Sequence, residues 1–198
     1  MPPRTWDRRA LASTAALSVA IALAGCDGGS SPDPTTPPAV TASPTPTSTP
    51  TPTVPSTPSR PDAMSSSTAE GAAATAEFFM TDLYPHIYRT GDLTEWDVLS
   101  SPDCTFCNNM RSKITEMLAA EERVEAGAMS ASNTATTEQR EGTWYLVSTR
   151  LSQEDSTRID SSGTPVSTTP GGTVDALIAL SWDGGWHVDE VELTPAGA

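Results

Sequence analysis

The feature that most constrains this chain is a proline-rich stretch near its beginning. Residues 27–64 hold 11 of the 18 prolines, set among Thr, Ser and Ala. Because this stretch has almost no large apolar side chains, it cannot bury enough surface to offset the entropy lost on ordering. Its repeated Thr-Pro and Ser-Pro steps favour extended polyproline conformations. We therefore expect residues 26–64 to be a disordered tether with an extended reach on the order of 100 Å, and such tracts are typical of O-glycosylated segments.

The segment before the tether has the pattern of an export signal. Three arginines and one aspartate lie within residues 1–9, and an uncharged run follows at residues 10–23. That run is too short to cross a bilayer, which takes roughly 20 apolar residues. A basic start followed by a short apolar run predicts a secretory signal peptide over residues 1–25. The pair Arg8-Arg9 leaves export through the twin-arginine route open.

The signal ends in Leu23-Ala24-Gly25-Cys26, which matches the bacterial lipobox. Small residues before the cut fit the signal peptidase cleft, and the cysteine thiol accepts a diacylglyceryl group before cleavage. The position of the cysteine and the small, polar residues 27–30 favour a lipobox over an ordinary signal peptide that contains a cysteine. We therefore expect Cys26 to carry lipid and to anchor the chain at the outer face of the cytoplasmic membrane.

Residues 65–198 are the part that we expect to fold, as one domain with one core. Once the leader is removed, 8 basic and 24 acidic residues remain, a net charge of −16. A surface this acidic repels nucleic acid and anionic lipid headgroups. The composition therefore predicts no nucleic-acid binding, and we interpret the charge as a source of solubility.

The folded part begins with helical patterns. A first helix is predicted over Thr68–Arg89, capped by Ser67 or Thr68 and ended by Gly91. Pro85 conflicts with it and should kink or split it after Tyr84. The apolar stripe of this helix has helical spacing and consists of Ala72, Ala76, Phe79, Leu83 and Ile87.

Two further helices are predicted before the strands begin. The first is a short helix or turn over Asp92–Leu99, anchored by Trp96 and Leu99. Ser101-Pro102-Asp103 should open the next, because Ser is a good N-cap and Pro suits the first helical position. Its expected buried stripe consists of Phe106, Met110, Ile114, Met117 and Leu118.

After Gly127 the pattern changes to that of strands. Asp183-Gly184-Gly185 is the clearest hairpin turn. The last strand changes its apolar phase, and a β-bulge near Asp189-Glu190 would account for that change. The predicted fold class is α+β, with three N-terminal helices packed on a curved antiparallel sheet. Four to six strands are expected from the segments 128–137, 143–151, 156–160, 173–182 and 186–193.

This arrangement resembles the nuclear transport factor 2-like cone, also called the cystatin-like or SnoaL-like fold. More narrowly, the chain is similar to an uncharacterised family of actinobacterial lipoproteins over residues 68–193. The motifs that carry this likeness are Gly91-Asp92, residues 99–104, Cys107 and residues 182–186. The resemblance implies a fold and assigns no active site.

With Cys26 expected to carry lipid, the remaining cysteines form an even pair, Cys104 and Cys107. Outside the membrane such thiols are normally oxidised, which favours a structural disulfide. A thioredoxin-type redox centre is the alternative, but there the Cys-x-x-Cys follows a central strand, whereas here it follows a helix and turn. Asp103 would also raise the pKa of a neighbouring thiol. His86 and His187 lack metal-ligand spacing to the cysteines, so no metal is predicted.

The aromatic residues are the main candidates for a ligand or partner site. In a cone fold they would either line a pocket or fill it as core. These candidates are Tyr84, Tyr88, Trp96, Trp144, Trp182 and Trp186. The titratable residues that could serve a pocket enzyme are Tyr84, Asp82, Asp97 and His187. We interpret both histidines as surface or boundary residues, and the acidic residues of segment 183–192 as a solvated strand face.

Three functional hypotheses follow, and no cofactor is predicted for any of them. The first is a non-enzymatic, membrane-anchored interaction module of the cell envelope, with Trp182 and Trp186 at a hairpin tip as its partner-binding face. The second is a carrier or enzyme that holds a small, apolar molecule in a cone pocket. The third is a thiol-disulfide redox protein. An interior filled with aromatic rings would favour the first, and an open cavity with a polar group would favour the second.

Overall fold

The computed structural model describes residues 55–197 of the chain. The expected signal peptide, the lipobox with Cys26, and most of the expected tether lie outside the described residues. Within 55–197, no helix is both long enough and apolar enough to cross a membrane.

The first predicted helix forms as three consecutive segments. They are α1 (Ala69–Glu77), a π-helical segment η2 (Phe78–Leu83) and α2 (Tyr84–Thr90). Pro85 lacks an N–H, and its ring would clash with a carbonyl in the preceding turn of an α-helix. The wider π turn before Tyr84 accommodates it, so the predicted split after Tyr84 is replaced by a split just before it. Thr68 caps α1 through the N–H of Gly71, and Gly91 ends α2 with φ of 73°, both as predicted.

Two more helices complete the helical layer. Helix α3 (Thr94–Leu99) buries Trp96 and Leu99, as predicted. Helix α4 (Thr105–Ala119) begins later than the sequence predicted. Its N-cap is Cys104, and residues 101–103 form a turn, closed by a hydrogen bond from Cys104 N to Ser101 O. The prediction that Ser101 and Pro102 open the helix is therefore wrong.

The main sheet has four antiparallel strands in the order β2-β3-β6-β7. They span Met129–Arg140, Trp144–Gln153, Gly172–Trp182 and Trp186–Pro195. Ala179 pairs with Glu190 while Leu180 pairs with Val188, so Asp189 is an extra residue in β7. This is the predicted β-bulge, and it lets Val188 and Val191 both face the core.

A second, three-stranded sheet continues the first past a sharp bend. Its order is β1-β4-β5, with bounds Arg123–Ala126, Ser156–Ile159 and Pro165–Thr169. Two glycines allow the bend: Gly127 has φ of 79°, and a Cβ on Gly171 would lie 2.4 Å from Gln153 O. Strands β1 and β5 were not predicted. Their side chains are short, polar or solvent-exposed, so they carry little hydrophobic signal.

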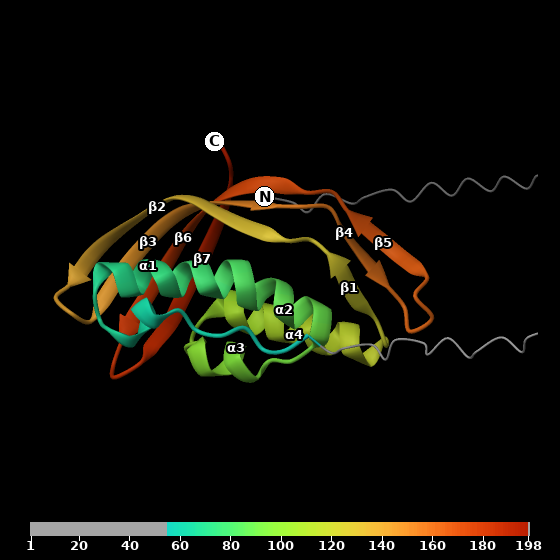
Figure 1. Ribbon diagram of the computed structural model, residues 1–198, viewed down its shortest axis with the longest axis horizontal. Coiled ribbons are helices and arrows are strands. Elements are labelled where there is room, and N and C mark those ends of the chain that lie inside the picture. Colours follow the sequence, from blue (N-terminus) through green and yellow to red (C-terminus); the bar gives the residue numbers. More distant parts are fainter. Residues whose placement is uncertain (1–54, 198) are drawn as a thin grey trace, which may run out of the picture. The chain divides into compact units, whose positions relative to one another are not determined.

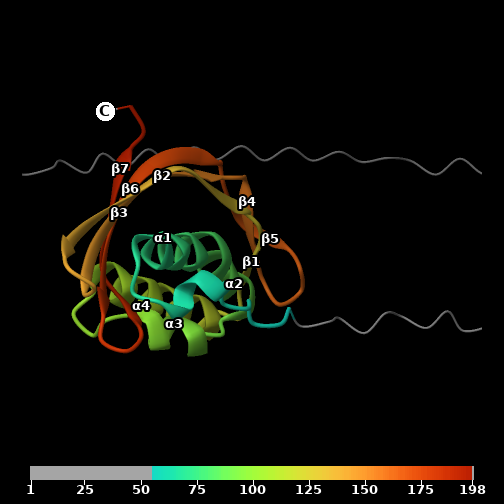
Figure 2. The same ribbon diagram turned by 60° about the vertical axis from the view of Figure 1, so that its left-hand side comes forward.

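The helices lie inside the curve of the sheets (Figures 1 and 2). Figure 2 shows the strands arching over α1 while β1, β4 and β5 descend beside α2. The structure confirms the predicted α+β class, with helices packed on a curved antiparallel sheet. The largest side chains of its core include Trp96, Trp186, Tyr145, Phe78, Phe79 and Met80.

The end of the expected tether lies against the domain. Thr57 donates to Asp92 at 3.2 Å, and Arg60 forms an ion pair with Glu95. Met64, in the short 3-10 helix η1 (Asp62–Ser65), is buried. Residues 55–64 therefore pack on α3 and the end of α2 and precede the domain as an ordered strap.

Two further residues differ from expectation. Leu118 was predicted to be buried in α4, but its exposed fraction is 46%, and Cys107 takes its place in a stripe with Met110, Ile114 and Met117. His86 was expected near the surface, but only 2% of it is exposed, and its Nε2 lies 3.9 Å from Asp92 Oδ2. The π turn explains His86, because it changes the rotation of α2 relative to α1.

Candidate functional site

A hollow of the described domain lies between α2 and the small sheet. It has a volume of about 340 Å³, within the range of small-molecule sites. We call it the neutral lobe. Its lining consists of Tyr84, Pro85, Tyr88, Val124, Gly127, Gln153, Ser156, Arg158, Ser167 and Thr169.

The register of the small sheet positions one wall of the neutral lobe. Arg158 on β4 pairs with Val124 on β1 and with Ser167 on β5, so the three form one row across the sheet. Ser156 pairs with Thr169 in a second row, two residues away along each strand. Because residues two apart share a face of a sheet, both rows face α2.

Two tyrosines of α2 form the opposite wall. Tyr84 and Tyr88 are four residues apart and therefore lie on one face of the helix. Their ring centroids are 5.0 Å apart, with the ring planes at 56°. Burial, and then the neighbouring Tyr88, raise the pKa of the Tyr84 phenol above 10.0. Tyr84 therefore stays protonated at ordinary pH, as a hydrogen-bonding group.

A second hollow of about 410 Å³ adjoins the first. We call it the charged lobe. The two lobes share Tyr88, Val124 and Arg158 in their linings. Arg158 Nε lies 3.2 Å from Glu122 Oε2, so its charge is already compensated. The other lining residues of the charged lobe are Lys113, Glu116, Met117, Ala120 and Glu122.

The structure brings two of the six aromatic candidates, Tyr84 and Tyr88, into the lobes. Trp96 lies in the core instead, fully buried and stacked on Phe79 with ring centroids 4.1 Å apart. Its indole Nε1 donates to Cys107 O at 3.4 Å. The middle of the cone is therefore filled, and open space remains at the end covered by the small sheet.

The other three tryptophans lie at the opposite end of the main sheet. Trp186 is 2% exposed and packs edge-to-face on Tyr145 and on Trp182. Trp182 is half-buried against the same core. Trp144 is half-buried at the start of β3. With Trp186 buried, the hairpin does not present a pair of exposed indoles to a partner.

The remaining titratable candidates lie outside both lobes. Asp82 is exposed beside Thr81, and Asp97 pairs with Arg111 on the outside of α3 and α4. His187 Nε2 lies 2.9 Å from Asp183 Oδ1 near the tip of the β6–β7 hairpin. Among the described residues, no three His, Cys, Asp or Glu side chains form a group that could hold a metal ion.

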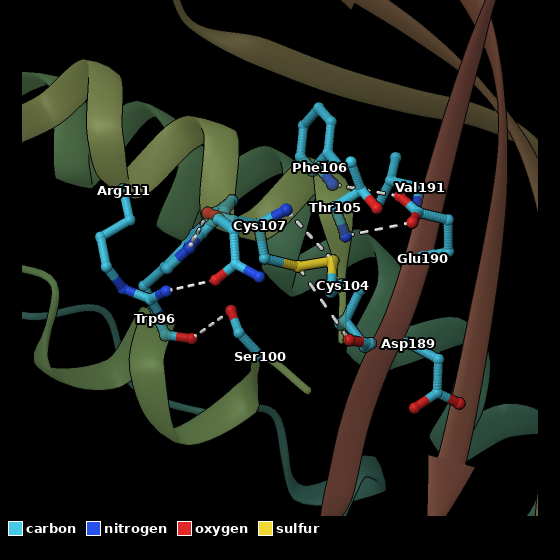
Figure 3. The surroundings of a disulfide bond; sticks show 12 residues. Trp96, Ser100, Cys104, Thr105, Phe106, Cys107, Arg111, Asp189, Glu190 and Val191 are labelled. Carbon is cyan, nitrogen blue, oxygen red and sulfur yellow. Dashed lines mark hydrogen bonds between the residues drawn. A yellow bond between two sulfur atoms is a disulfide. The ribbon is translucent and has the colours of Figure 1, made fainter. Parts of the chain in front are cut away.

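Cys104 and Cys107 form the predicted disulfide, at the start of α4 (Figure 3). Both cysteines are fully buried, against α3 and the backbone of Val188. Cys104 Sγ also accepts a hydrogen bond from Cys107 N at 3.1 Å. The bond is thus part of a helix start, and its burial opposes exchange with an external thiol.

The acidic residues of segment 183–192 were expected to form a solvated strand face, but Glu190 instead binds the start of α4. Its two carboxylate oxygens accept hydrogen bonds from the backbone N–H groups of Thr105 and Phe106, both at 3.1 Å. Burial raises its pKa, but hydrogen bonds from the backbone of Val191, Phe106 and Thr105 outweigh burial and hold that pKa below 4.5. The adjacent Asp189 is half-buried, and burial raises its pKa.

Sequence reasoning missed the small-sheet side of the neutral lobe. Gln153, Ser156, Ser167 and Thr169 sit in polar segments that resemble ordinary loops and exposed strands. A usable signal was present at Gly127 and Gly171, since glycines that interrupt strand-like segments indicate a bend or a close backbone approach. Bends predicted at these two glycines would have indicated a second sheet that covers α2.

Comparisons with known proteins agree with this fold. The intermembrane space region of the chloroplast protein ARC6 has a similar structure, with a TM-score of 0.51 at 12% identity over 65% of this chain and 98% of that chain. A protein of unknown function with a cystatin-like fold from Nostoc punctiforme PCC 73102 matches with a TM-score of 0.36 at 11% identity, over 63% and 94% of the two chains. The likeness to the ARC6 region concerns the fold alone. No curated protein matches the sequence.

The sequence also matches a protein family described as a family of unknown function, DUF6318. The match covers residues 41–192, which include the strap, helices α1–α4 and both described sheets through most of β7. The chain therefore belongs to the family of unknown function DUF6318.

Proposed function

We propose that this chain is a lipid-anchored, extracytoplasmic binding protein of the actinobacterial lipoprotein type, whose domain binds a small molecule in the neutral lobe without transforming it. The anchor is the lipid on Cys26, and residues 27–54 form the tether that sets the domain away from the membrane. The lobe supplies the binding activity, and the strap joins the tether to the helical layer.

The anchor is supported by the sequence. Leu23-Ala24-Gly25-Cys26 follows a basic segment and an apolar run at the spacing that lipoprotein export requires. The disulfide is consistent with an oxidising compartment, since such bonds persist mainly outside the cytoplasm. Both features favour the outer face of the cytoplasmic membrane.

The observation that carries the binding function is the shape and lining of the neutral lobe. Core side chains fill the middle of the domain, yet this end keeps about 340 Å³ between two tyrosines and a row of short polar side chains. Such a concave surface with convergent polar groups is the usual form of a small-molecule site. We therefore favour the second hypothesis, a ligand in the pocket, over the first, a partner that binds at Trp182 and Trp186.

The chemistry of the lining favours binding over catalysis. General acid–base catalysis needs a group whose pKa lies near the working pH. The Tyr84 pKa moves away from neutrality, and the Arg158 guanidinium is paired with Glu122. These groups suit orientation of a ligand by hydrogen bonds, which is the task of a binding protein.

The binding function can be tested with a blocked variant. We suggest ligand-observed NMR with a library of neutral and charged fragments against the full chain in detergent micelles. Ser167→Trp places an indole in the lobe, whereas Thr168→Trp adds the same indole at the neighbouring position of β5, outside the lining. Consecutive residues of a strand face opposite sides, so the second variant is a matched control.

We expect fragments that bind the wild type and Thr168→Trp and that lose binding to Ser167→Trp. A set of fragments that binds all three proteins equally would place the site elsewhere and contradict the proposal. Melting temperatures of the two variants, measured in the same detergent, show whether loss of binding accompanies loss of the fold.

The anchor is tested separately, in a bacterial host that processes lipoproteins. A clickable palmitate analogue should label the wild-type chain and leave Cys26→Ala unlabelled, and the variant should leave the membrane fraction. Equal labelling of the two chains would overturn the assignment of Cys26.

A further inference from the structure

We infer that the neutral lobe binds an uncharged saccharide, either a free sugar or the end of a glycan chain. This inference rests on the proposed binding function and adds the chemical class of the ligand. Four features of the lobe support it: polar side chains without a partner in the protein, their mixed donor and acceptor character, the compensated charge of Arg158, and the ring and aliphatic faces beside them.

The first feature is that polar side chains of the lobe are not used by the fold. Within residues 55–197, no side-chain hydrogen bond joins Gln153, Ser156, Ser167 or Thr169 to another residue, although all four line one hollow. These four side chains are therefore available to a ligand that enters the lobe.

The second feature is the kind of polar group. Four hydroxyls offer hydrogen bonds to the lobe, from Tyr84, Ser156, Ser167 and Thr169, together with the amide of Gln153. The hydroxyl of Tyr88 already donates to Met110 Sδ at 3.6 Å. A hydroxyl both donates and accepts, and an amide offers two donors and an acceptor. Sugar hydroxyls are also donors and acceptors at once, so each can pair with such a group in either direction. A purely apolar ligand would leave these groups unpaired, at a cost in affinity.

The third feature is the charge. No carboxylate lines the neutral lobe to attract a cation, and its one cation, Arg158, is 3.2 Å from Glu122. An anionic ligand would also approach a domain with a large excess of acidic residues. The lobe thus selects against either sign of net charge and in favour of a neutral, hydrogen-bonding molecule.

The fourth feature is the set of non-polar faces beside the hydroxyls. Tyr84 and Tyr88 contribute rings from α2, and Pro85 and Val124 contribute aliphatic surface. A sugar ring carries C–H groups on its faces and hydroxyls on its rim. Aromatic faces attract such C–H groups because the face of a π-system is negative. Rings on one wall and short polar groups on the other match this division.

The experiment titrates the full chain with uncharged sugars while backbone amide shifts are recorded by NMR. An amine-oxide detergent is used, because glycosidic detergents would themselves compete for the lobe. The probes are glucose, galactose, mannose, arabinose and N-acetylglucosamine, each also as its methyl glycoside. A free-sugar site prefers the reducing sugar, and a site for a glycan end accepts the methyl glycoside equally well.

The matched variants are Thr169→Val and Thr168→Val, which remove the same hydroxyl from neighbouring residues of β5. Only Thr169 lines the lobe. We expect Thr169→Val to weaken binding of the preferred sugar roughly two- to tenfold, the loss of one hydrogen bond. Thr168→Val should leave the affinity unchanged. Ser167→Trp should abolish binding.

Saturable shifts around Tyr84, Ser156 and Thr169 that follow this order of variants support the inference. Two results overturn it: no sugar of the panel produces saturable shifts, or Thr168→Val and Thr169→Val weaken binding equally. The fragment experiment tests the proposed binding function separately. If fragments bind the wild type and lose binding to Ser167→Trp while no sugar binds, the neutral lobe is still a ligand site and only the saccharide class is overturned.

Discussion

Glu190 of β7 accepts a hydrogen bond from the backbone N–H of Phe106 at 3.1 Å, across 84 positions of sequence. With its second oxygen on Thr105 N, Glu190 satisfies two of the first N–H groups of α4. Cys107 N donates to Cys104 Sγ, and the N–H of Cys104 itself donates to Ser101 O. A helix leaves four such groups unpaired at its start. The last strand and the disulfide together therefore define where α4 begins.

The cap predicts a specific loss of stability. Glu190→Gln keeps one acceptor oxygen but loses the charge that interacts with the helix dipole. We expect it to lower the free energy of unfolding by about 0.5–2 kcal/mol, the usual worth of an N-cap. Glu192→Gln, an exposed change on the same strand, is the control and should change little. Urea unfolding of the three proteins measures the difference. Equal stability of the two variants would show that Glu190 does not stabilise the start of α4.

The hydrogen bonds between Glu190 and the start of α4 also predict a pH dependence of stability. Backbone hydrogen bonds from Val191, Phe106 and Thr105 outweigh burial and hold the pKa of Glu190 below 4.5, its ordinary value. The folded state thus favours the charged form, so the stabilisation is present above pH 4.5 and is lost as the pH falls through the lowered pKa. We expect the stability gap between wild type and Glu190→Gln to be constant near neutrality and to close in acid. Urea unfolding over a pH series checks this. A stability gap that widens in acid would contradict a lowered pKa of Glu190 in the folded state.

The disulfide and the N-cap can be separated by choice of replacement. Serine at both Cys104 and Cys107 removes the covalent bond but keeps an N-cap oxygen at position 104, whereas alanine removes both. We expect the double serine variant to be less stable than the wild type by less than about 3 kcal/mol, because the loop is short. The double alanine variant should lose about 1 kcal/mol more. Thermal unfolding compares them; identical double variants would show that Sγ does not act as a cap.

Two adjacent glycines test the bend that positions the small sheet. A Cβ on Gly171 would lie 2.4 Å from Gln153 O, whereas nothing lies within 4 Å of a Cβ on Gly172. We therefore expect Gly171→Ala to cost about 1–3 kcal/mol through overpacking. Gly172→Ala should be nearly neutral or slightly stabilising, because it restricts only the unfolded chain. Unfolding in urea distinguishes them, and similar values for both would mean that the bend does not depend on Gly171.

The sequence predicted the features that depend on local patterns. The caps Thr68 and Gly91, the burial of Trp96, the bulge at Asp189 and the disulfide are all confirmed. Each has a signal within a few residues: a cap residue, an apolar anchor, a change of strand phase, or a cysteine pair. The α+β class followed from the order of these elements.

The features that depend on distant contacts were not predicted. Ser101 is a good local N-cap, but α4 begins at Thr105 because Glu190, far along the chain, supplies the acceptors. His86 is buried because the π turn before α2 rotates the helix. The candidate site was half predicted: Tyr84 and Tyr88 were named, but the wall formed by β4 and β5 has polar side chains without apolar periodicity.

The central claim is that a ligand lies between α2 and the small sheet, and its most direct measurement is the location of a bound molecule. We suggest a backbone amide shift map of the full chain with the tightest-binding neutral compound from the fragment or sugar titrations. We expect the largest shifts on residues 84–88, 124–127, 153–158 and 167–169. Largest shifts at the β6–β7 hairpin around Trp182 and Trp186, with the neutral lobe unchanged, would contradict it.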